Sequence, residues 1–162
     1  MLDTKGNIIV QAIYDEIDGF ADNGLAPVRS NGKWGYVGKN GNVKLSFAYE
    51  AATPFYQGYA WVLSTENDQY KLIDTNGMTV ITLGTREVPG SMFHNGLCRV
   101  NVYGDYSIET TKYIDTEGNV IYYWTNNYDA PARVQGRGKL DLAEMFAATP
   151  YGPMFNNKKS RK

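Results

Sequence analysis

The feature of this sequence that most constrains its fold is a turn motif that recurs along most of the chain. The form Asp/Gly-x-x-Gly occurs at residues 3–6, 38–41, 74–77 and 115–118, and its glycines are 35, 36 and 41 residues apart. A second motif, which runs from a phenylalanine to a valine, lies between the turns. Two motifs that keep step at this period predict an array of supersecondary units, none of which can bury its apolar face alone.

Turn chemistry and period-2 patterns predict three strands in each unit. An Asp side chain can bond the backbone amides that follow it, and the glycine supplies a residue with positive φ. Asn31-Gly32 is a strong hairpin signal between two extended stretches. The expected strands are residues 7–13, 25–30, 33–37, 42–47, 59–64, 70–74, 78–83, 97–103, 107–115 and 119–124.

Superposing the strands that end the second motif predicts which face is buried. Ala26, Ala60 and Cys98 fall at one position, and a valine follows each of them two residues later on the same face. We therefore expect these three small residues to be buried in equivalent places. The opposite face carries Pro27, Trp61 and Arg99, a mixture that predicts a surface only partly covered.

The stretch from Tyr14 to Val37 carries a family resemblance. Residues Tyr14-Asp15, Phe20, 24–28 and 32–37 resemble the bacterial WG-repeat family, which is named for the pair seen here as Trp34-Gly35. The resemblance covers roughly residues 3 to 124, although later units have Tyr-Lys and Thr-Lys in place of the Trp-Gly pair. It implies a β-rich repeat domain with an interaction role, and it implies no catalytic residues. We therefore expect an all-β, open, twisted array of about four three-stranded antiparallel repeats.

Composition excludes several classes of protein. A chain of 162 residues with 43% hydrophobic and 14% aromatic residues can fill a core. Its single cysteine excludes an internal disulfide framework, no signal peptide is evident at the start, and no apolar run suits a spanning helix. We expect no membrane insertion, and residence in the cytoplasm or within a viral or bacterial assembly.

The candidates for chemistry are few. Cys98 and the only histidine, His94, lie four residues apart, a spacing that invites a nucleophile-base or metal-site reading. However, Cys98 replaces an alanine of the other units, and the chain has no other Cys or His to complete a zinc site. The sequence therefore predicts no catalytic residues, no bound metal and no cofactor, and the protein is not expected to be an enzyme.

The composition changes after the repeats, which suggests a β-repeat domain at 1–126 and a C-terminal segment at 127–162. Residues 133–162 carry seven basic and two acidic groups, whereas the rest of the chain carries nine basic and fifteen acidic ones. Residues 139–148 predict one short helix before Pro150. Its apolar face and the basic end are candidate partner-binding residues: Leu142, Met145, Phe146, Lys158, Lys159 and Arg161.

Two functions from different classes remain. The first is a non-catalytic module that joins a larger assembly through its repeat surface and its C-terminal segment, with a protein or a second copy of itself as partner. The second is a glycan- or peptidoglycan-binding module with Trp and Tyr platforms, for which Trp61 is the candidate ligand-binding residue. Nucleic acid is not favoured as a partner, because the basic cluster at the end holds no aromatic residue.

Overall fold

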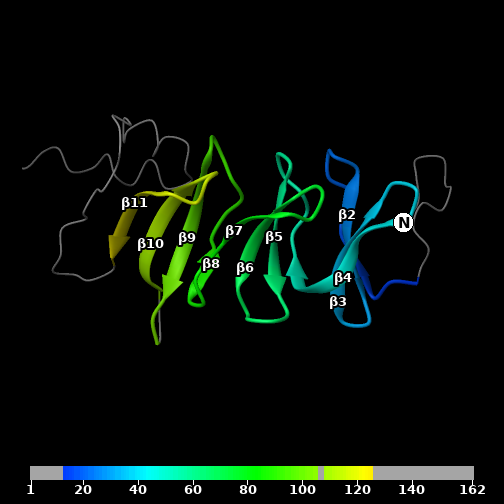
Figure 1. Ribbon diagram of the computed structural model, residues 1–162, viewed down its shortest axis with the longest axis horizontal. Coiled ribbons are helices and arrows are strands. Elements are labelled where there is room, and N and C mark those ends of the chain that lie inside the picture. The colour runs from blue at the N-terminus through cyan, green and yellow to red at the C-terminus, as the bar shows by residue number, and fades with distance from the viewer. Residues whose placement is uncertain (1–12, 106–107, 126–162) are drawn as a thin grey trace, which may run out of the picture.

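The computed structural model describes residues 13–105 and 108–125, and in them the chain is an open all-β array (Figure 1). The predicted fold class is confirmed for this part of the chain. The strands are β1 (Glu16–Ile17), β2 (Leu25–Ser30), β3 (Lys33–Gly38), β4 (Val43–Ala52), β5 (Tyr59–Ser64), β6 (Tyr70–Asp74), β7 (Thr79–Thr82), β8 (Glu87–Pro89), β9 (Leu97–Tyr103), β10 (Ile108–Asp115) and β11 (Val120–Thr125).

The strands pair in chain order. Strands β1 to β7 form a seven-stranded sheet, and β8 to β11 form a four-stranded sheet. Each strand pairs antiparallel with the next one along the chain within its sheet. The described fold is therefore built from local hairpins, as the turn signals predict.

Strand β4 serves two neighbouring units. Its first half pairs with β3, where Val43 lies opposite Val37, and its second half pairs with β5, where Ala52 lies opposite Val62. In the next unit the same path is interrupted at residues 83–86: β7 pairs with β6, and β8 pairs with β9. A described unit thus has a short first strand, namely β1, the second half of β4 or β8, in addition to the three that were predicted. The first described unit runs from β1 to the first half of β4, the second from the second half of β4 to β7, and the third from β8 to β11.

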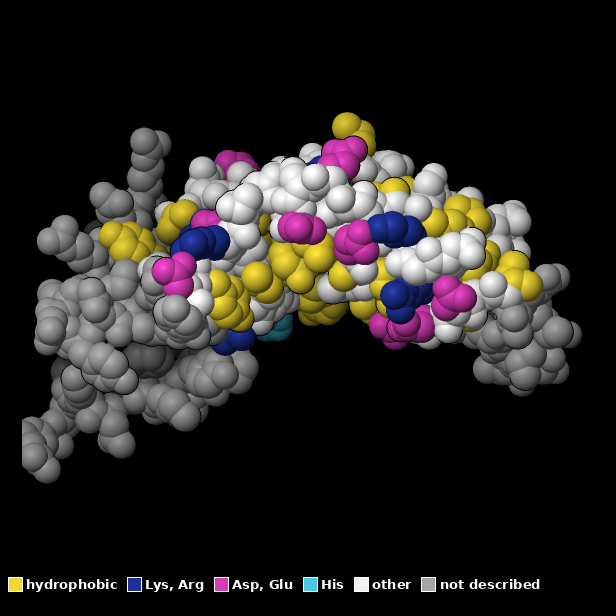
Figure 2. All heavy atoms as spheres, turned by 90° about the horizontal axis from the view of Figure 1, so that it is seen from below, with side chains coloured by type: hydrophobic (Ala, Val, Ile, Leu, Met, Phe, Trp, Pro, Cys, Tyr) yellow, Lys and Arg dark blue, Asp and Glu magenta, His cyan; other side chains and the backbone are white. Residues whose placement is uncertain are grey.

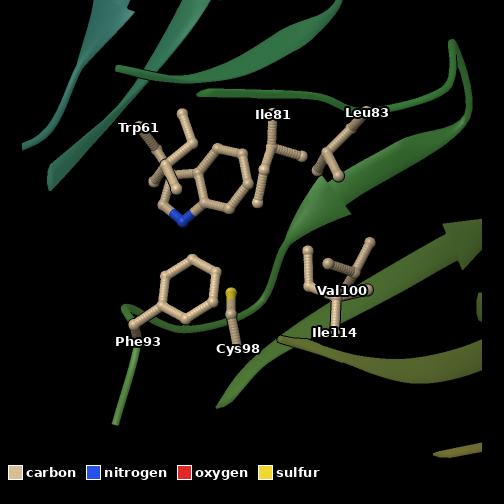
Figure 3. Packing of buried hydrophobic residues seen from close by; sticks show 8 residues of the cluster. Trp61, Ile81, Leu83, Phe93, Cys98, Val100 and Ile114 are labelled. Atoms are coloured by element: carbon tan, nitrogen blue, oxygen red, sulfur yellow. The ribbon is translucent and has the colours of Figure 1, made fainter. Parts of the chain in front are cut away.

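Successive described units stack face to face, and apolar cores lie within the first unit and at both interfaces. The first cluster contains Ala26, Val28 and Val37, and the second contains Tyr36 together with Ala60 and Val62. The third joins the two sheets, because strands β5 to β7 pack there against the third unit (Figure 3). Its buried members are Trp61, Leu72, Ile81, Leu83, Phe93, Cys98, Val100 and Ile114.

The predicted inward face is confirmed and the predicted outward face is wrong. Ala26, Ala60 and Cys98 are all fully buried. On the other side of the same strands, however, Pro27 and Trp61 are also buried, and only Arg99 is partly exposed. The physical reason is the stacking: the second face of one unit packs against the first face of the next, so the inner strands are covered on both sides.

The turns are held by side chains, as predicted. The Asp74 carboxylate accepts hydrogen bonds from the amides of Asn76 (2.9 Å) and Met78 (2.8 Å). Asp115 does the same for Glu117 (2.9 Å) and Asn119 (2.8 Å). At the turn where Gly38 replaces the aspartate, the side chain of Asn40 accepts a bond from the Asn42 amide instead, at 3.2 Å. The expected strand 7–13 and the expected helix 139–148 lie outside the described residues.

Candidate interaction surface

Exposed aliphatic side chains begin the last strand of each described unit. Val43 at the start of β4 and Val120 at the start of β11 hold equivalent positions, 49% and 43% exposed. In the middle unit Met78 and Val80 flank the equivalent Thr79, and they are 67% and 43% exposed. We call Val43, Met78, Val80 and Val120 the outer-strand aliphatic residues. Figure 2 shows hydrophobic side chains along the length of one face, between charged ones.

These residues lie on strands that have one unpaired side within the described ranges. The first half of β4 pairs only with β3, β7 pairs only with β6, and β11 pairs only with β10 among the described strands. Unpaired strand edges present backbone N–H and C=O groups that another extended chain can bond. The surface therefore combines backbone hydrogen-bonding groups with exposed apolar side chains.

The turns before β7 and β11 fix where these strands start. At Asp74 the amide of Met78, followed by that of Asn76, lowers the pKa of the carboxyl. At Asp115 desolvation acts in the opposite direction, but hydrogen bonds from Asn119, Glu117 and Gly118 outweigh it and lower the pKa. Both carboxylates are therefore ionised at neutral pH, which keeps them acceptors for the turn amides.

Ion pairs on the array join strands or loops that lie side by side or one strand apart. Lys112 on β10 reaches Glu87 on β8 at 2.6 Å, and Arg86 pairs with Asp105 at 3.1 Å. Arg29 pairs with Glu16, and Lys33 pairs with Glu50. Four basic side chains of the described surface are thus each matched by a nearby carboxylate.

Trp61 is not an exposed platform. Its side chain is 1% exposed, and its ring stacks on that of Phe93 with centroids 6.3 Å apart (Figure 3). Stacking on a sugar would require an accessible face of the Trp61 ring. The ring is instead enclosed in the core between the second and third units. This expectation is corrected: Trp61 packs the junction between units.

Cys98 and His94 occupy different environments. The Cys98 thiol is buried and donates to the carbonyl of Ser91 at 3.1 Å, whereas His94 is exposed in the turn before β9. Burial raises the pKa of Cys98 to about 11, although the hydrogen bond with Ser91 acts against it. A thiol with a raised pKa is a poor nucleophile at neutral pH.

Metal sites, membrane-spanning helices and the C-terminal candidate residues can be assessed only within the described ranges. Within residues 13–105 and 108–125, no group of three or more His, Cys, Asp and Glu side chains could hold a metal ion. The same ranges contain no helix of the length and apolarity needed to cross a membrane. The candidate residues Leu142, Met145, Phe146, Lys158, Lys159 and Arg161 lie outside the described residues and stay predictions.

The outer-strand aliphatic residues were missed from the sequence. Their signal is an aliphatic residue one to three positions after the turn glycine, as in Gly41-Asn42-Val43 and Gly77-Met78-Thr79-Val80. This signal resembles that of any strand, because sequence alone does not say which strand ends a unit. The pairing of the strands decides it.

The fold and this surface define an open β-repeat module. Residues 1–34 and 34–64 each match the family model for the WG containing repeat. These two stretches are thus similar to the WG containing repeat, which confirms the family resemblance. The structure shows that the later units have the same strand order without the Trp-Gly pair.

The structure explains the glycine of the Trp-Gly pair. A Cβ atom added to Gly35 would lie 2.7 Å from the carbonyl oxygen of Leu45 and 3.0 Å from the ring of Phe47. Strand β4 approaches β3 this closely where the register shifts between Trp34 and Tyr36. The glycine is therefore required by the close approach of two backbones.

Comparisons with other known proteins are sparse. No curated protein matches the sequence. Among solved structures, Kluyveromyces lactis Hsv2 is similar with 10% sequence identity and a TM-score of 0.34, over 75% of this chain and 48% of that one. A second structure, Kluyveromyces lactis Hsv2 complete loop 6CD, has 10% identity and a TM-score of 0.33, over 75% and 47%. The chain thus spans about half of those chains, and TM-scores this low support no argument.

Proposed function

We propose that the protein is a non-catalytic interaction module that joins a larger protein assembly through its β-repeat surface and its C-terminal segment. The observation that supports this most is the set of outer-strand aliphatic residues on strands with an unpaired side. A strand of a partner protein that pairs there would satisfy backbone groups and cover apolar side chains in one step.

The repetition strengthens the proposal. One exposed valine on a protein surface needs no explanation. Here Val43 and Val120 hold equivalent positions in the first and third described units, and Met78 and Val80 lie beside that position in the second. A partner with several strands or with a repeat of its own would therefore meet a similar apolar contact more than once, and its affinity would rise with the number of contacts.

Glycan binding is the weaker alternative. It depended on exposed aromatic platforms, and Trp61 is buried. Tyr56 and Tyr103 are exposed, at 43% and 39%, but they lie in different units at positions that are not equivalent. We therefore favour a protein partner, with a second copy of the chain as one form of it.

The test is to isolate the native complex with the full chain and with a triple variant, Val43→Lys, Val80→Lys and Val120→Lys. We expect the full chain to elute as a complex of defined stoichiometry and the variant to elute as a folded monomer. The matched control is Thr65→Lys, Thr75→Lys and Thr116→Lys, which adds the same charge at exposed turn positions. Retention of the complex by the valine variant, or binding to a glycan array instead, would overturn the proposal.

A second variant lacks residues 127–162. We expect it to keep the β-sheet circular dichroism of the full chain and to lose or weaken the complex. If the shortened chain unfolds, the C-terminal segment stabilises the repeats and is not an attachment element.

A further inference from the structure

The chain contains Asn-Gly pairs at five turns, and asparagine in such a pair can deamidate spontaneously. They are Asn23-Gly24, Asn31-Gly32, Asn40-Gly41, Asn76-Gly77 and Asn95-Gly96. The amide nitrogen of a glycine can attack the side-chain carbonyl of a preceding asparagine, because no Cβ obstructs the approach. All five pairs lie within the described residues, so the structure can rank them.

The reaction balances with water as the only co-reactant. The glycine nitrogen loses its proton and forms a bond to Cγ of the asparagine, the Cγ–Nδ2 bond breaks, and ammonia leaves. Water then opens the resulting succinimide at either carbonyl, which gives aspartate or isoaspartate. No oxidant or reductant takes part. A glycine amide that donates a hydrogen bond is held away from this attack, and so is an asparagine whose side chain is bonded elsewhere.

In four of the pairs the glycine amide is engaged. Gly24 donates to the carbonyl of Ala21 at 2.8 Å, and Gly41 donates to Gly38 at 2.8 Å. Gly77 donates to Asp74 at 2.9 Å. The Gly32 amide donates to the carboxylate of Asp15 at 3.3 Å.

Three of the four asparagine side chains are engaged as well. Asn23 accepts a bond from the Leu25 amide at 3.1 Å, and Asn40 accepts one from Asn42 at 3.2 Å. Asn76 donates from its side chain to Asp74 at 3.5 Å. Only Asn31 resembles Asn95 in having no side-chain bond within the described part of the chain, and its glycine is held by Asp15.

Asn95-Gly96 has neither restraint. Within the described residues no group accepts a hydrogen bond from the Gly96 amide, and the Asn95 side chain, which is exposed, makes none. Its turn is closed by one pair of backbone hydrogen bonds between His94 and Leu97, at 2.8 and 3.0 Å. Exposed turns open locally at small cost, and such opening allows the backbone to reach the geometry of attack.

We propose that Asn95 is a site of spontaneous deamidation in the folded protein, and that it reacts before the other four asparagines. The turn lies between Phe93 and Cys98, both buried in the core that joins the two sheets. Isoaspartate would add a backbone methylene to this turn, and either product adds a negative charge beside His94. The modification therefore acts on the junction between the second and third units.

The second unit supplies a matched control. Gln57-Gly58 occupies the equivalent turn, with φ of 49° at Gln57 and 49° at Asn95. The glutamine side chain would have to close a larger ring, which forms far more slowly. The variant Asn95→Gln therefore reproduces a turn that this fold already contains and removes the reactive group.

The experiment incubates the full chain at mildly alkaline pH, natively and in denaturant, and measures deamidation of each Asn-Gly pair by peptide mass spectrometry. Natively, we expect position 95 to deamidate several-fold faster than any other pair, and Asn95→Gln to lose this signal. In denaturant the five rates should converge. Another pair reacting first in the folded protein, or the same order in denaturant, would overturn the proposal.

Asp15→Ala tests the cause. This variant frees the Gly32 amide, so we expect native deamidation of Asn31 to rise toward the rate of Asn95 while the other three pairs are unchanged. Circular dichroism checks that the variant is folded. An unchanged rate at Asn31 in the folded variant would contradict the role of the amide hydrogen bond.

Discussion

At the residue scale, two small residues lie where a backbone or a neighbouring unit packs closely against them. Gly35 and Cys98 are both in the described core region, one against the backbone of β4 and the other in the cluster shared by the two sheets. Neither residue has room for a larger side chain, but for different reasons. At Gly35 the obstacle is the Leu45 carbonyl, and at Cys98 it is packed side chains.

Gly35→Ala should destabilise the protein by about 1–3 kcal/mol, because the added methyl group meets the Leu45 carbonyl and β4 must move. Urea unfolding measures the change. Gly19→Ala is the control, because a Cβ atom there has no heavy atom within 4 Å. Equal stability of the two variants would show that β4 shifts freely.

Cys98→Ala should change stability little, because the other units have alanine at this position. Cys98→Phe should cost about 1–3 kcal/mol through overpacking. Because burial raises the pKa of the thiol to about 11, a thiol reagent at pH 8 should modify the unfolded protein much faster than the folded one. Rapid modification of folded protein, followed by mass spectrometry, would contradict this account.

The sequence predicts the small residues of the core but not the hydroxyl groups around it. The Thr53 hydroxyl accepts a bond from the Trp61 amide at 3.0 Å, and the Ser91 hydroxyl accepts one from the Arg99 amide at 3.0 Å. Both hydroxyls lie two residues before a buried phenylalanine, so superposing the units contained this signal. In the first unit the equivalent strand residue is Pro27, which has no amide proton to donate.

At the element scale, the inner strands were predictable and the first strands of the units were not. Residues 25–30, 59–64, 70–74 and 97–103 form strands as predicted, since each alternates or follows a clear turn. Residues 48–52 (Ala-Tyr-Glu-Ala-Ala) and 87–89 (Glu-Val-Pro) have weak strand propensity. They are extended because a neighbouring strand pairs with them, and their own composition does not indicate this pairing.

The Asp turns predict an acid-sensitive stability. The pKa of Asp74 and that of Asp115 are lowered in the folded protein. Their contribution is therefore complete above the pKa of an unfolded aspartate, about 3.9, and is lost as the pH falls through the lower folded values. We expect stability to fall below about pH 4, and we expect Asp74→Ala with Asp115→Ala to flatten this part of the profile.

The measurement is the urea midpoint of the parent and the double variant between pH 2 and 7. Asp22→Ala with Glu66→Ala is the control, because these two carboxylates are exposed and make no hydrogen bond or ion pair within the described residues. A double turn variant with the same acid dependence as the parent would show that other carboxylates control the transition.

At the scale of the whole molecule, two of the three described cores lie between units, so we expect an isolated unit to be unstable. Trp61 belongs to β5 and packs against Phe93 and the third unit. This is why its burial could not be predicted: the sequence of one unit does not state what stacks on it. Coupling of this kind is expected for repeat arrays, in which interfaces between neighbours carry much of the stability.

Trp61→Ala should destabilise the array by about 3–5 kcal/mol, because it leaves a cavity at the junction of the two sheets. Hydrogen exchange should show lost protection in β6 and also in β10, which is in the other sheet. Tyr56→Ala, an exposed aromatic substitution, should change neither. Loss of protection confined to the second unit would mean that the two sheets unfold independently.

The path of β4 has a consequence for how such a chain can grow. The same strand ends one unit and begins the next, so no loop separates the two units. A segment one period long therefore contains every strand of a unit, whichever residue it starts from. Duplicating such a stretch in tandem would lengthen the array without inventing a new connection. Residues 83–86 interrupt the equivalent strand between β7 and β8. We therefore expect this segment to accept inserted residues more readily than β4 does.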